Sequence, residues 1–100
     1  MDPAGIPALI DAVRHLHGCE ATFVESVPVH ETHEGATVWQ GEVSVFSIVG
    51  HALASRCYAW SEASTGVRRR FFAVLHVPPV DSPAKAVQAS IVADARAARN

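Results

Sequence analysis

The chain has 100 residues, of which 49% are hydrophobic and 18% are charged, and its formal net charge is −2. This composition is typical of one globular domain, which we expect to span residues 1–100 and to bury about 60–70% of the surface of the unfolded chain. The slightly negative charge argues against a general affinity for nucleic acid or anionic membranes. Two cysteines are too few for a disulfide framework, which favours a cytoplasmic protein. Because no run of 18 apolar residues and no signal peptide is present, we expect no membrane partner.

A first helix is predicted from Asp2 and Pro3, which can form its N-cap and first position, to Gly18, which can end it. Apolar residues recur between them at helical spacing: Ile6, Leu9, Ile10, Val13 and Leu16. The segment therefore has one face suited to packing on a core.

Four extended segments follow, at residues 19–30, 37–49, 52–61 and 67–77, each rich in β-branched and aromatic residues. The connections at 31–36, 50–51 and 62–66 are short and contain glycine, so they favour antiparallel hairpins over crossovers. In the first segment, Ala21, Phe23, Val27 and Val29 alternate on what we expect to be one side.

A second helix is predicted to begin at Pro83, with Asp81 or Ser82 as its N-cap. Its apolar stripe consists of small residues and aliphatics: Ala84, Val87, Ile91, Ala95 and Ala98. The predicted fold class is therefore α+β, with element order α-β-β-β-β-α, a four-stranded antiparallel meander sheet, and both helices packed on one face.

The stretch HETHEG at residues 30–35 raises the question of a metal site. The zinc-protease signature needs two histidines four apart on a helix, whereas His30 and His33 are three apart between two predicted strands. A metal would need further ligands, for example Glu34 or His51. We interpret the stretch as a hairpin turn and expect no metal and no cofactor.

The other candidate catalytic residues are not expected to lie together in one site. Glu25 interrupts the apolar side of the first strand, either as a buried carboxylate or because of a β-bulge near Pro28, and the bulge is favoured. Cys57 and His76 could form a nucleophile and base, but the expected register puts them on opposite faces of neighbouring strands.

In the third hairpin, one pairing register places different kinds of side chain on the two faces. Pairing Ser61 with Val67 sets Trp60 opposite Arg68, Tyr58 opposite Arg70 and Arg56 opposite Phe72. Small and aliphatic side chains then line the other face, where they can meet the helices.

Two helices on one face would leave the other face of the sheet uncovered. The residues expected there, as an interface or ligand surface, are Tyr58, Trp60, Phe72, Val74 and Arg56. A two-residue turn at 50–51 adds Trp39, Val43 and Val45 to this face, and a three-residue turn adds Phe46 and Ile48 instead. Large exposed apolar patches usually mark contacts, so we predict a homodimer through this face, with Trp60→Asp giving a monomer or insoluble protein.

Three functions are considered. The first is a small non-enzymatic binding or structural protein, homodimeric, with room for a small hydrophobic ligand between sheet and helices. The second is nucleic-acid or anion binding through the hairpin with Arg68 and Arg70. The element order resembles that of double-stranded RNA-binding domains, but those have three strands and a lysine cluster on the last helix, where this chain has only Lys85. The third is a small-pocket enzyme that uses His76, Glu42 or Glu25.

Overall fold

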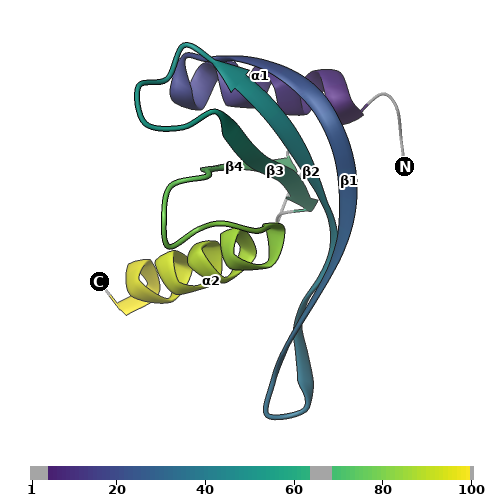
Figure 1. Ribbon diagram of the computed structural model, residues 1–100. Helices are drawn as coiled ribbons and strands as arrows, with labels where there is room; N and C mark the ends of the chain where they lie inside the picture. The colour runs from purple at the N-terminus through teal and green to yellow at the C-terminus, as the bar shows by residue number, and fades with distance from the viewer. Residues whose placement is uncertain (1–4, 64–68, 100) are drawn as a thin grey trace.

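The computed structural model describes residues 5–63 and 69–99. The elements, in chain order, are α1 (Gly5–His17), β1 (Glu20–His33), β2 (Ala36–Val49), β3 (Arg56–Ala63), β4 (Arg69–Leu75) and α2 (Pro83–Arg99). The strands form one antiparallel sheet in the order β1-β2-β3-β4 (Figure 1). The predicted α+β meander is confirmed.

Both helices end or begin at the predicted signals. Gly18 follows α1 with φ 69°, and its N–H donates to the carbonyl of Arg14, as expected for a glycine that ends a helix. Ser82 caps α2, because its Oγ accepts a hydrogen bond from the N–H of Lys85 at 3.2 Å. The proposed cap at Asp2 and Pro3 lies outside the described residues.

The helices pack on opposite faces of the sheet, so the prediction that both share one face is wrong. One core cluster joins Leu9 and Val13 of α1 to Phe46, Ile48, Cys57 and Ala59. A second cluster joins Ala86 and Val87 of α2 to Val43, Val45, Tyr58 and Trp60. Since neighbouring residues of a strand point to opposite faces, the alternation from Cys57 to Trp60 assigns one helix to each side (Figure 1).

A β-bulge at Val24 explains why β1 has apolar side chains on both faces of the sheet. The pairing of β1 with β2 shifts by one residue between Phe23 and Glu25. Phe23 therefore packs in the cluster beneath α1, whereas Val27 and Val29 pack beneath α2. One extra residue reverses the facing of a strand, so the expected single apolar side of this strand is wrong. Glu25 is exposed, and the bulge lies at Val24 rather than near Pro28.

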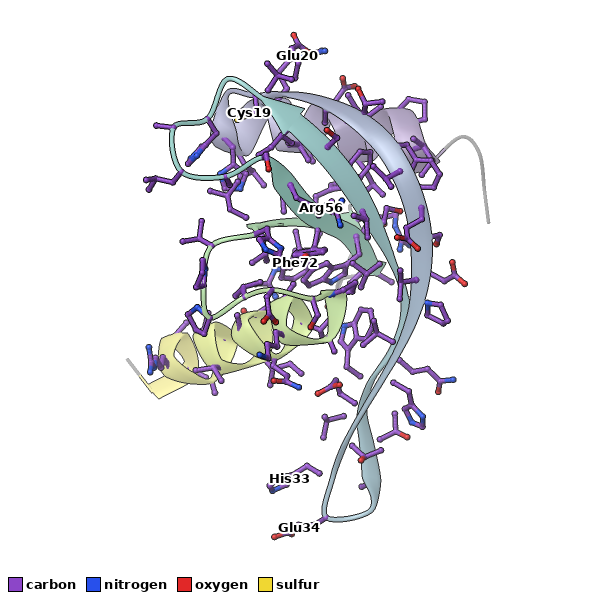
Figure 2. The ribbon with its side chains drawn as sticks, viewed as in Figure 1. Cys19, Glu20, His33, Glu34, Arg56 and Phe72 are labelled. Atoms are coloured by element: carbon purple, nitrogen blue, oxygen red, sulfur yellow. The ribbon has the colours of Figure 1, made fainter. Side chains whose placement is uncertain are left out.

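The HETHEG stretch forms a tight hairpin turn, as interpreted. Glu34 and Gly35 have φ values of 52° and 82°, and His33 pairs with Ala36. Positive φ at both central residues is the type I′ geometry that matches the twist of the flanking strands. The strands thus run further than predicted, and the tip with His33 and Glu34 projects past α2 (Figure 2).

The β2–β3 connection differs from prediction in length, and the β3–β4 pair differs in register. β3 begins at Arg56, so residues 50–55 form the β2–β3 connection instead of a two-residue turn. Val45 still pairs with Tyr58, which puts Val43 and Val45 on the side of Tyr58 and Trp60, one of the two alternatives. In the β3–β4 pair Ser61 lies opposite Phe71, not Val67. The shift is an even number of residues, so each side chain keeps its predicted face.

Candidate interaction surfaces

The face expected to be open is buried beneath α2. Tyr58 and Trp60 are each 2% exposed, and Phe72 and Val74 pack partly buried in the same cluster. Figure 2 shows Phe72 between the sheet and α2. These four residues form core and cannot be the exposed contact surface that the sequence suggested. Of the predicted set only Arg56, opposite Ser47, is exposed.

Aromatic side chains form a continuous layer in this core. The ring of Trp60 stacks on Phe72, with 5.1 Å between centroids and 7° between planes, and Trp39 meets Trp60 edge to face at 5.9 Å. Both indole N–H groups donate to Oε2 of Glu62, at 2.8 and 2.9 Å. A carboxylate that accepts both donors lets two tryptophans be covered without leaving their N–H groups unpaired.

The arginines of β4 have partners within the chain. Arg70 makes two hydrogen bonds to Asp94 of α2, at 2.8 and 3.2 Å, and its guanidinium lies 4.7 Å from the centroid of the Phe72 ring. Arg69 donates to Oγ and the carbonyl oxygen of Ser61. Arg68 lies outside the described residues. The predicted aromatic–arginine pairs across the strands are wrong, since Trp60 lies opposite Phe72 and Tyr58 opposite Val74. Arg70 instead contacts Phe72 of its own strand and holds α2 to the sheet.

The titratable residues considered for catalysis are not brought together. His76 Nδ1 lies 2.5 Å from the Tyr58 hydroxyl, beyond the end of β4. Glu42 of β2 accepts a hydrogen bond from Ser26 of β1, and Glu25 is exposed on β1. Burial raises the pKa of Tyr58, and the charge of Arg56 opposes that rise. The Tyr58–His76 pair fastens the segment after β4 to the core.

The cysteine and histidine candidates also separate. Cys57 is buried in the α1 cluster while His76 contacts Tyr58 on the other side, as predicted. Burial raises the pKa of Cys57 to about 12, which keeps the thiol protonated at neutral pH. At the hairpin, His30 bonds to Thr37 and His33 lies near Glu34. Within residues 5–63 and 69–99, no group of three or more His, Cys, Asp and Glu side chains could hold a metal ion.

An apolar region missed from the sequence surrounds β4, which is an edge strand. Phe71 is 39% exposed, and Leu16 of α1 beside it is 52% exposed. Hollows on the two sides of β4 are lined by Ala8 and Ala12 of α1 and by Ala89 and Ala93 of α2. The signal available in the sequence was the position of Phe71, which the predicted register assigned to a covered face.

Comparisons with protein-family models, curated proteins and solved structures gave no match. Neither α1 nor α2, nor any other helical stretch among the described residues, is long and apolar enough to cross a membrane.

Proposed function

We propose that the protein is a small non-enzymatic binding or structural protein that functions as a homodimer. The observation that carries this proposal is the exposed apolar region beside the edge strand β4. Both faces of the sheet are covered by a helix, yet Phe71 and the neighbouring Leu16 stay exposed beside β4, an edge strand that is lined by apolar hollows. Exposed apolar patches next to an open strand edge are typical of protein contacts.

The disposition of polar groups supports a non-catalytic role. A general base must reach a substrate in a cleft, whereas His76 and Glu42 are hydrogen-bonded within the fold. Glu25 stands alone on the outer strand. A small hydrophobic ligand stays a prediction, and the two core clusters already fill the space between the sheet and each helix with side chains.

Native mass spectrometry and light scattering on the purified chain test this proposal. We expect a species of twice the 10.7 kDa chain mass at micromolar concentrations, without bound metal. A monomer at up to about 100 μM would contradict it, since that implies a dissociation constant weaker than most specific homodimers have. A co-purified small molecule in the same spectrum would identify a ligand.

A further inference from the structure

The two edges of the sheet are not equivalent, and the directions of their backbone groups show why. In antiparallel pairs, the N–H and C=O of one residue point to its neighbour strand, and those of the next residue point away. The N–H of Ile48 donates to the carbonyl of Ser55, on the β3 side. The backbone N–H and C=O groups of the odd-numbered residues Val43, Val45 and Ser47 therefore point to β1. Pro28 of β1 lies opposite Glu42, whose backbone groups point to β3. The backbone of Pro28 therefore points outward, away from β2.

The β1 edge is therefore protected. Pro28 has no N–H to offer to an added strand, and the bulge at Val24 breaks the regular spacing of the groups beside it. Proline and bulges are the common devices by which edge strands avoid further pairing. An approaching strand would find no continuous ladder on this side.

On β4 the outward-pointing groups belong to the odd-numbered residues, because the N–H of His76 donates inward to Arg56. Two of their carbonyls already have donors. Nε2 of His17 lies 2.7 Å from the carbonyl oxygen of Ala73, and the N–H of Val77 donates to Leu75 at 2.9 Å. Phe71 thus keeps both its N–H and its C=O directed away from β3, and its pairing with β3 shows no bulge.

We infer that two copies of the chain join through their β4 edges, with Phe71 on the twofold axis, to make one continuous eight-stranded sheet. This inference rests on the proposed homodimer and specifies its contact. A strand centred on Phe71 is self-complementary: each Phe71 donates to and accepts from Phe71 of the second copy. Ala73 then pairs with Arg69 of the second copy: the Ala73 N–H meets the Arg69 carbonyl, and the Arg69 N–H meets the Ala73 carbonyl, which would accept a second hydrogen bond beside that of His17.

The charges of Arg69 and Arg70 also favour the register centred on Phe71. Centring on Phe71 sets Arg70 opposite Phe72 of the second copy and Arg69 opposite Ala73. Centring on Arg69 or Arg70 would oppose two arginines, and like charges directly opposite destabilise a strand pair. Centring on Phe72 or Ala73 would need the carbonyls of both Ala73 and Leu75, which already accept from His17 and Val77, whereas centring on Phe71 needs only that of Ala73. Phe71, Leu16 and the alanines of both helices would be covered along the same line.

The test compares Phe71→Lys with Val38→Lys. Val38 is 51% exposed on the projecting hairpin, so its variant adds the same charge at a similarly exposed β position. We expect the wild type and Val38→Lys to dimerise alike, and Phe71→Lys to raise the dissociation constant at least about tenfold through like-charge opposition at the axis. A dimer of unchanged affinity in Phe71→Lys overturns the edge contact while the homodimer stands. A monomeric wild type overturns the homodimer and this contact with it.

Hydrogen exchange on the wild type gives a reading that needs no variant. The amides of Phe71 and Ala73 are expected to become protected as protein concentration rises through the dissociation constant, while the amide of Ser26, on the β1 edge, stays unchanged. If Phe71→Lys does not fold, this measurement decides alone. Phe71 and Ala73 amides that exchange at the same rate in monomer and dimer overturn the inference.

Discussion

The ring of Trp60 lies flat on Phe72 across the β3–β4 pair, with 5.1 Å between centroids, under α2. The pair is the centre of a core cluster, since Trp60 is 2% exposed. A change at Trp60 should therefore act first on folding and only secondarily on assembly.

Trp60→Ala is expected to lower the free energy of unfolding by about 3–5 kcal/mol, because it removes a buried aromatic side chain and leaves a cavity. Urea denaturation followed by circular dichroism measures the change. Val38→Ala, at an exposed position, should stay within about 0.5 kcal/mol of wild type. A Trp60→Ala variant of full stability would show that α2 does not cover this ring.

Gly41→Val is expected to displace Trp39. A Cβ atom at Gly41 would lie 3.1 Å from Cη2 of Trp39, so the indole rests directly on this glycine. We expect a loss of about 1–3 kcal/mol in unfolding free energy from overpacking and a red shift of the tryptophan emission. Gly5→Ala, where no atom lies within 4 Å of the added Cβ, is the control. An unshifted spectrum would count against the contact.

The pKa of Tyr58 should lie above its ordinary value of 10 in the folded protein, because burial disfavours the phenolate. Tyr58 is the only tyrosine, so absorbance at 295 nm reports it directly. A raised folded-state pKa means that this contribution to stability is fully present below pH 10. It is lost as the pH rises through the folded value. A native titration midpoint at or below that of the urea-unfolded chain would refute the prediction.

The Arg70–Asp94 ion pair predicts how the stability of the protein falls in acid. The Arg70 guanidinium holds the pKa of Asp94 below its ordinary value of 3.8 by hydrogen bonding. The contribution is therefore present above pH 3.8 and declines as the pH falls through the lower folded value. Asp94→Asn should flatten the fall in unfolding midpoint between pH 5 and 3, measured at low salt, since both groups are largely exposed. An equally steep fall in the variant would indicate that other carboxylates cause it.

Cys57 should be inert in the native state. Its pKa of about 12 leaves almost no thiolate at pH 8, and Cys19 is buried as well. Ellman's reagent is expected to report no fast thiol in the folded protein and both thiols in 6 M guanidinium chloride. A rapid reaction of one thiol before unfolding would show that a core cluster opens.

Several features were predicted correctly from local signals, because each depends on neighbouring residues alone. Gly18 ends α1, Ser82 caps α2, and Glu34–Gly35 makes the tight turn. The face of each β3 and β4 side chain was also predicted correctly, since an even shift of register preserves the alternation.

The sequence by itself thus determined the elements, their order and the antiparallel meander. Only the tertiary structure decided which helix covers which face, because a sheet that is apolar on both sides accepts a helix on either one. A single extra residue at Val24 made both sides of β1 apolar in succession, and no local pattern distinguishes that bulge from regular alternation. The tertiary structure also decided the surroundings of the sheet edge at β4, where His17, distant in sequence, lies 2.7 Å from the carbonyl oxygen of Ala73 and Phe71 stays 39% exposed.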